Sequence, residues 1–340
     1  MAYTQQALDY ANGQREQYLN KLIELLSIES ISTLPEHRNE VRRAAEWIAA
    51  YMRTIGFQRA EVLETEGHPV IYGEWLAAPG RPTVLVYGHY DVQPVDPLEE
   101  WQTKPFEPEI KDDYIYARGS SDDKGQFFAH LAAAEAYLKT IGELPVNVKF
   151  LIDGEEEIGS AHLEAFVADH RDLLNADVAL ISDSQMISPN QPAIIYGLRG
   201  LVYMEVEVRG PKHDLHSGLH GGAVHNPLQA LCEMIAKLHD EQGRVTIPGF
   251  YDHVRPLSAE ERTELARLPF DEAQYRQEIG VPQMWGEVGY SVVERLGVRP
   301  TLERYRNDHS LLGHMGSGIL EARIYSAGTN RQVWAGFEVK

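Results

Sequence analysis

The chain has 340 residues, of which 43% are hydrophobic and 24% charged, and its formal net charge at pH 7 is −20. This acidity excludes the basic surface that nucleic-acid binding requires, and no apolar run reaches the roughly 18–20 residues of a membrane span. Residues 1–19 are polar and lack the apolar segment of a signal peptide, and the single Cys232 is typical of a reducing compartment. We therefore expect a cytoplasmic protein that binds neither nucleic acid nor membranes and is large enough for two domains.

The first part of the chain alternates between helical and strand-like segments. Helical periodicity covers four segments: 4–28, 36–56, 123–142 and 160–174. Short apolar runs typical of buried strands lie at 83–88, 147–153 and 177–182. This alternation predicts an α/β fold in which helices flank a mostly parallel mixed sheet, and we assign it to residues 1–197.

The pattern changes near Gly200. The segment LVYMEVEVRG alternates apolar and polar residues, as a half-exposed antiparallel strand does. Helical segments follow at 223–243, 260–268 and 271–280. We predict a second, α+β domain over residues 198–303.

A histidine and several carboxylates follow the predicted strands, where sites gather in such sheets. They are His89 and Asp91, then Asp122 and Asp123, then Glu155, Glu156 and Glu157, and finally Asp183. Taken singly, each has a structural explanation: a satisfied histidine, a helix N-cap, or a solvated acidic loop. Gathered at one edge of a sheet, the carboxylates would repel one another unless cations neutralised them. Imidazole and carboxylate ligands suit two divalent ions, most simply zinc, with manganese or cobalt as alternatives.

Six motifs stand in the order and spacing of a known family: YGHYDVQPVDPLEEW, PFEPEIKDDYIYARGSSDDKGQ, GEEEIGS, ISD, YGLRGL and DLHSG. The chain resembles the zinc aminoacylase, carboxypeptidase and deacylase superfamily of metallopeptidases, from about residue 15 to Glu303. HYDVQP, followed by Trp101 and PFEP, resembles the carnosinase-type dipeptidase branch. The resemblance implies a phosphorylase/hydrolase-like catalytic domain with an inserted α+β lid and dimerisation domain.

The resemblance also assigns the metal ligands. His89 and Asp183 would bind one metal ion, and Glu157 the second. Asp122 would bridge the two ions, with a cis peptide bond to Asp123.

The resemblance implies three further roles, in the hydrolysis of a dipeptide by a water that bridges the two metals. Asp91 would orient His89, and Glu156 would be the general base. His216 would reach across a homodimer and stabilise the oxyanion in the partner's site. Glu155 matches none of these roles and would be a nearby supporting charge.

The resemblance ends after Glu303. The segment 304–340 is basic and shows no clear periodicity. We interpret it as an anomalous tail from a frameshifted or spliced reading. The catalytic domain would then lack its C-terminal return and the final histidine ligand of the second metal. Alternatively, the chain is a divergent short form in which His309 or His314 supplies that ligand.

Three functional hypotheses remain open from the sequence. The first is a dinuclear metallo-dipeptidase that is homodimeric in its full form. The second is an N-acyl-amino-acid deacylase on the same scaffold. The third is an inactive truncated product that binds one metal ion at most.

Overall fold

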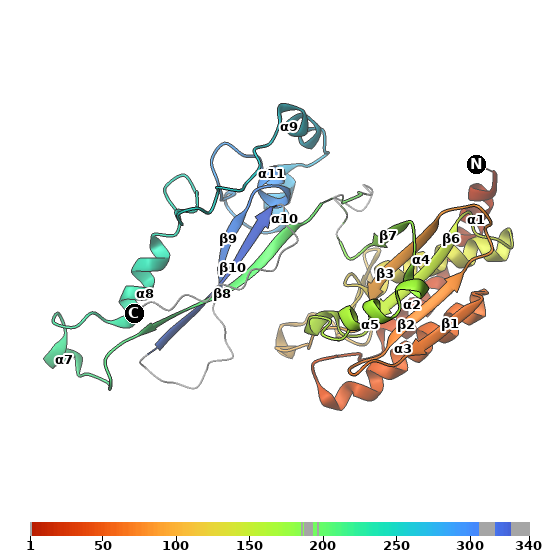
Figure 1. The fold of residues 1–340 in the computed structure, drawn as a ribbon, viewed down its shortest axis with the longest axis horizontal. Coiled ribbons are helices and arrows are strands. Elements are labelled where there is room, and N and C mark those ends of the chain that lie inside the picture. Colours follow the sequence, from red (N-terminus) through yellow and green to blue (C-terminus); the bar gives the residue numbers. More distant parts are fainter. Residues whose placement is uncertain (1, 185, 187–192, 196, 306–316, 328–340) are drawn as a thin grey trace. The chain divides into compact units, whose positions relative to one another are not determined.

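The computed structural model describes residues 2–184, 186, 193–195, 197–305 and 317–327 (Figure 1). The chain divides into two compact units, Met1–Gln185 and Met186–Lys340. The division falls after Gln185, before the boundary that we placed after residue 197. The assignment of the two parts as catalytic domain and lid remains a prediction. Among the described residues, none of the helices is long and apolar enough to cross a membrane.

The first unit is built on a five-stranded sheet in the order β1-β2-β6-β3-β7. The strands are β1 (Arg59–Leu63), β2 (Val70–Trp75), β3 (Thr83–His89), β6 (Asn147–Asp153) and β7 (Val178–Ile181). β3 pairs in parallel with β6 and β7, whereas β2 pairs antiparallel with β1 and β6. Every strand except β2 therefore points the same way, which confirms the mostly parallel mixed sheet.

The register of the parallel strands brings their carboxyl ends to one edge. His89, the last residue of β3, is level with Asp153, the last residue of β6. On the other side of β3, Tyr87 is level with Ile181 at the end of β7. The acidic segments that follow these strands consequently start from the same edge of the sheet.

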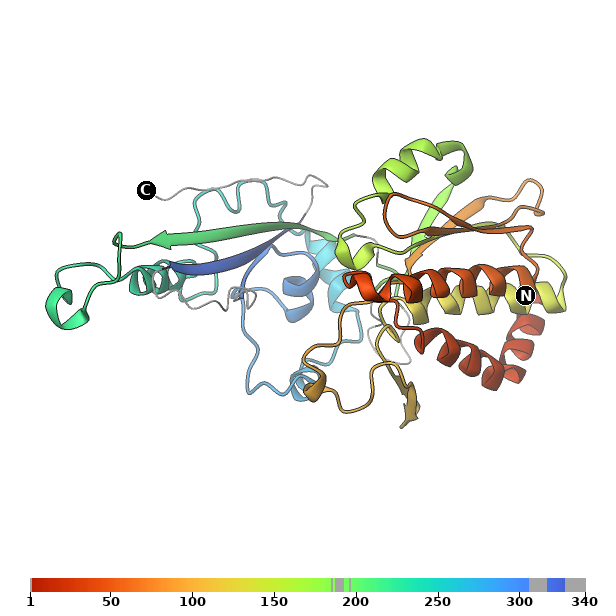
Figure 2. The ribbon, with the colours of Figure 1, turned by 90° about the horizontal axis from the view of Figure 1, so that it is seen from below.

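Helices cover both faces of this sheet (Figure 2). They are α1 (Ala2–Gly13), α2 (Arg15–Leu26), α3 (Arg38–Ile55), α4 (Lys124–Thr140), α5 (Leu163–Asp169) and α6 (Arg171–Leu174). Alternate residues of β6 point to opposite faces. Phe150 and Ile152 join the core formed with α3 and α4, and Leu151 joins a smaller core with Phe166 of α5 and Leu174 of α6. The predicted helices are confirmed, although the first is divided at Gln14 and the last at His170.

Some short elements of the first unit were not predicted. They are the strands β1 and β2, the hairpin β4 (Glu109–Lys111) and β5 (Tyr114–Tyr116), and the 3-10 helices η1 (Pro35–His37), η2 (Leu98–Glu100) and η3 (Glu156–Ile158). Of these, η3 bears directly on the site because it holds two of the three consecutive glutamates.

The second unit contains an antiparallel sheet in the order β8-β10-β9. Its strands are β8 (Arg199–Arg209), β9 (Thr301–Tyr305) and β10 (Ser317–Ala327), and its helices are α7 (Ser217–His220), α8 (Pro227–Ala236), α9 (Ala259–Ala266), α10 (Glu272–Glu278) and α11 (Val292–Gly297). The α+β character is as predicted. The helix expected over 223–243 is shorter, because Asn226 caps it at one end and a turn over Asp240–Gly243 follows it.

The segment that we interpreted as an anomalous tail contains regular structure. Residues 304 and 305 complete β9, and 317–327 form β10 between β8 and β9. His309 and His314 lie outside the described residues, so their proposed ligand role stays a prediction.

Candidate metal centre

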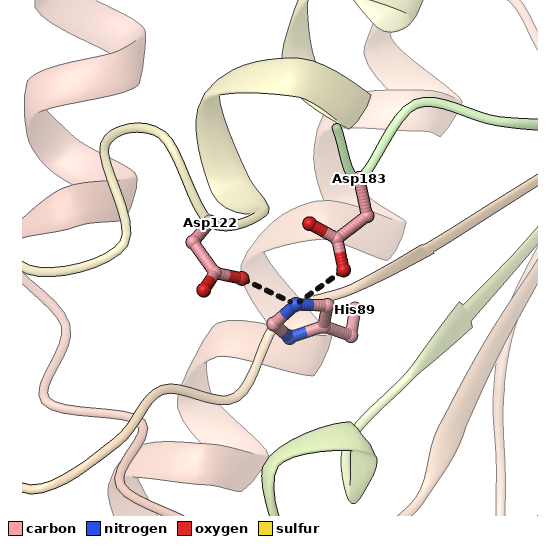
Figure 3. Close-up of side chains that lie close together, drawn as sticks. All are labelled: His89, Asp122 and Asp183. Carbon is pink, nitrogen blue, oxygen red and sulfur yellow. Dashed lines mark hydrogen bonds and ion pairs between the residues drawn. The ribbon is translucent and has the colours of Figure 1, made fainter. Parts of the chain in front are cut away.

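His89 is the central residue of the site (Figure 3). It is completely buried at the end of β3. Its Nε2 lies 2.9 Å from Oδ1 of Asp122 and 3.7 Å from Oδ2 of Asp183. The aspartates come from the loop before α4 and from the segment after β7, so three separate parts of the chain meet at one imidazole nitrogen.

The other ring nitrogen faces Asp91. Nδ1 of His89 lies 3.1 Å from the backbone oxygen of Asp91 and 3.4 Å from its Oδ1. An acceptor at Nδ1 fixes the tautomer that presents Nε2 to a metal ion. Burial alone would lower the pKa of His89, but its bonds to Asp122 and Asp91 raise it to about 11. The surrounding carboxylates therefore favour the doubly protonated, cationic form of this ring.

Asp123 places a buried carboxylate against the backbone of His89. The peptide bond between Asp122 and Asp123 is cis. Asp123 stands at the N-cap position of α4, yet its side chain makes no capping bond. Instead, Oδ2 accepts a hydrogen bond of 3.1 Å from the backbone N–H of His89. Its buried Oδ1 has no hydrogen-bond partner among the residues that the structure describes, and burial raises the pKa of this carboxyl to about 7.

The turn η3 carries Glu156 and Glu157 to the same edge. The two carboxylate oxygens of Asp91 accept hydrogen bonds from the backbone N–H groups of Glu156 and Glu157, each 3.1 Å long. Asp91 thus contacts the buried histidine on one side and fixes the first turn of η3 on the other.

The carboxylates of this edge destabilise one another's charged forms. Burial raises the pKa of Glu156, Glu157 and Asp183. Neighbouring carboxylates raise these pKa values further, since Glu157 and Asp183 act on Glu156, and Asp122 acts on both Glu157 and Asp183. A bound cation would remove this repulsion.

The donor atoms at this edge fit a divalent metal ion. One ligand atom each from His89, Asp122 and Asp183 lies within 4.8 Å of the other two. The histidine is buried and both aspartates are exposed, so the cluster opens to solvent. One imidazole with carboxylates is a ligand set for zinc, manganese or cobalt. The crowded carboxylates, which raise one another's pKa values, agree with a cation at this place.

Glu155 has a different environment from the two glutamates that follow it. Its side chain is buried. Oε1 accepts a hydrogen bond of 2.9 Å from the backbone N–H of His68, and Oε2 accepts one of 2.7 Å from Nδ1 of His162. Glu155 is therefore a fixed acceptor that anchors η3 to the loop before β2.

His216 belongs to the second unit, whereas the residues of the cluster belong to the first. It is the exposed N-cap residue of α7, and its Nδ1 accepts a hydrogen bond of 3.0 Å from the backbone N–H of Gly218. Its predicted role in catalysis stays a prediction.

Two supporting residues were not identified from the sequence. Lys124 is completely buried, and its Nζ donates hydrogen bonds to the backbone oxygens of Leu25 (3.2 Å) and Ile28 (2.8 Å). Nε2 of His130, a residue of α4, lies 2.5 Å from Oγ of Ser182, which precedes Asp183 in the chain. The position of Lys124 directly after two aspartates was a usable signal. His130 gives no signal, because only the packing of α4 brings it to the end of β7.

Comparison with known proteins shows the family of the chain. The family described as Peptidase family M20/M25/M40 matches residues 85–317. The chain belongs to this family. It is 33% identical over 315 residues to the human Beta-Ala-His dipeptidase, covering 88% of this chain and 62% of that protein. It is 34% identical over 263 residues to a Cys-Gly metallodipeptidase of Candida albicans, covering 73% and 54% of the two chains.

The fold is also that of a solved family member. The crystal structure of human carnosine dipeptidase 1 matches with a TM-score of 0.82 at 30% identity, over 96% of this chain and 73% of that chain. The chain thus spans about three fifths of the length of the human Beta-Ala-His dipeptidase that it matches.

Proposed function

We propose that this M20 protein hydrolyses dipeptides with the help of two divalent metal ions. The observation that carries the proposal is the meeting of His89, Asp122 and Asp183 at the carboxyl edge of the sheet, with η3 held beside them. The names of the two relatives, both dipeptidases, favour this substrate class over N-acyl amino acids.

His89 and Asp183 would hold the first ion and Glu157 the second, with Asp122 between them. The ions would neutralise the carboxylates, polarise the scissile carbonyl and lower the pKa of the attacking water. Asp91 keeps His89 in the required tautomer through its contacts with Nδ1.

Glu156 is the general base in this proposal. Burial raises its pKa, so its carboxylate is a better proton acceptor than an exposed glutamate. Glu156 accepts a proton from the attacking water and later donates it to the leaving amine. Its backbone N–H is fixed by Asp91, which limits where the side chain can lie.

The finer features of the proposal concern metal, assembly and location. Zinc is the first choice for the histidine-carboxylate ligand set, with manganese and cobalt as alternatives. His216 would stabilise the oxyanion from the partner chain of a homodimer, with the second unit as lid and dimerisation domain. A single free cysteine, Cys232, supports a reducing, cytoplasmic location.

The test compares the parent chain with Glu156→Gln in the presence of Zn²⁺. Substrates are β-alanyl-histidine, cysteinyl-glycine and an N-acetyl amino acid, and the number of bound ions is measured in parallel. The variant should keep its ions and lose about 10²–10⁴-fold in turnover, the usual contribution of a general base. Glu16→Gln, an exposed glutamate on α2, serves as control.

Each outcome has a separate meaning. Near-parental turnover in Glu156→Gln would show that the base is assigned wrongly. Cleavage of the N-acetyl amino acid but of neither dipeptide would establish the deacylase instead. Binding of ions without hydrolysis of any substrate would show that this chain alone is inactive.

A further inference from the structure

Gln93 lies on a backbone segment that is fixed on both sides. The preceding residue, Val92, is completely buried, and its N–H donates a hydrogen bond of 2.9 Å to the backbone oxygen of Ser30. The following residue, Pro94, accepts a hydrogen bond of 2.7 Å from Nη2 of Arg118 through its backbone oxygen. The side chain of Gln93 therefore starts from a defined position, although it is itself exposed.

The amide of Gln93 makes two contacts with one residue. Nε2 donates to Oε2 of Glu157 at 2.8 Å and to the backbone oxygen of Glu157 at 3.2 Å. An amide nitrogen has two hydrogens, so it can serve both acceptors of Glu157 at once. The pair of bonds fixes the carboxylate relative to its own backbone, and η3 is fixed to Asp91 through the N–H of the same residue.

A neutral donor suits this position better than a cationic one. An arginine or lysine would neutralise Glu157 and compete with a metal ion for it. An amide holds one oxygen and leaves the negative charge in place. Among the described residues, none donates a hydrogen bond to Oε1 of Glu157, so this oxygen remains available to a ligand.

We infer that Gln93 is a positioning residue that orients Glu157 toward the second metal ion. The inference rests on the proposed function, in which Glu157 binds that ion. Removing the hydrogen-bond partner of a metal ligand typically weakens metal affinity about 10–100-fold. Gln93 should act on the second ion alone, because it contacts none of His89, Asp122 and Asp183 through the hydrogen bonds of its side chain.

The experiment is a Zn²⁺ titration of the full chain by calorimetry. The variants are Gln93→Leu, Glu157→Gln and the double variant. Gln274→Leu is the matched control, since Nε2 of Gln274 donates to Glu278 at 2.7 Å on the exposed face of α10. Gln93→Leu should weaken the second, weaker binding step about 10–100-fold and leave the first unchanged. The same change should have no added effect when Glu157 is already glutamine.

The outcomes separate the inference from the function on which it rests. If the parent binds two ions and Gln93→Leu binds both with parental affinity, Gln93 has no positioning role and the dinuclear site stands. If Gln93→Leu weakens binding equally with and without Glu157, the effect does not pass through Glu157 and the inference is wrong. If Glu157→Gln changes no Zn²⁺ affinity, Glu157 is not a ligand, and both the inference and the dinuclear site are wrong.

Discussion

Gly67 allows the buried carboxylate of Glu155 to reach its partners, so Gly67→Ala should be costly. An added Cβ would lie 2.7 Å from Cδ of Glu155, closer still to its Oε1, and 2.5 Å from Nδ1 of His162. These distances are well inside van der Waals contact. The carboxylate cannot simply rotate away, because it is buried and bonded at both oxygens.

The expected cost follows from the two hydrogen bonds that the overlap breaks. A hydrogen bond to a charged group contributes about 1.5–3 kcal/mol, so the loss is about 3–6 kcal/mol. Replacing glycine by alanine also lowers the entropy of the unfolded chain, which stabilises the folded state by about 0.4–1 kcal/mol. The net destabilisation is therefore about 2–5.6 kcal/mol, which corresponds to a fall in Tm of about 4–22 °C for a unit of this size.

Urea unfolding followed by circular dichroism measures this change. Gly13→Ala is the control, because an added Cβ there meets nothing within 4 Å; it should change the free energy of unfolding by less than about 1 kcal/mol. In a Glu155→Ala background, Gly67→Ala should cost less than in the parent, since the overlap with Glu155 is gone and only the contact with His162 remains. An equal cost with and without Glu155, or a small cost in the parent, would refute this explanation.

The remaining predictions concern pH and metal ions. Tyr51 donates a hydrogen bond of 2.5 Å to Glu135. The pKa of Tyr51 is raised, mainly by burial and secondly by the carboxylate of Glu135. The stabilisation of the fold by Tyr51 is thus complete below pH about 10 and is lost as the pH rises further. The reason is that the phenol of the unfolded chain loses its proton at a lower pH than the phenol of the folded chain. Tyr51→Phe should be about 1 kcal/mol less stable than the parent at pH 8. This difference should shrink by up to about 1.4 kcal/mol per pH unit above pH about 10. Urea unfolding at pH 8 and pH 11 measures the difference, and an equal value at both would contradict the prediction. Zn²⁺ at a hundred times its dissociation constant should raise the free energy of unfolding of the parent by about 2.7 kcal/mol, and a chelator should reverse this change. An equal increase in Asp122→Asn would exclude the proposed ligand set.

The sequence predicted the parts of the fold whose pattern is local. β3, β6 and β7 are short, mostly apolar runs, α3 shows clear periodicity, and α4 is rich in alanine, so all were found. The expectation that β7 is buried was wrong, because its four residues are exposed. β2 was missed because Gly73 interrupts its pattern. The structure gives the reason for that glycine: an added Cβ would lie 2.5 Å from Sδ of Met52 in α3. A close approach between a helix and a strand is a tertiary fact that no local pattern reports.

By itself, the sequence determined which residue types stand at the strand ends, and therefore that a histidine and several acids would gather at one edge of a sheet. It could not separate the neighbours Glu155, Glu156 and Glu157 by their surroundings, because adjacent residues of one type carry the same local signal. The tertiary structure separates them: Glu155 turns inward to His68 and His162, while Asp91 holds the backbone of the other two at the site. Side-chain direction depends on the turn η3 and on partners distant in the chain, and both exist only after the sheet has formed.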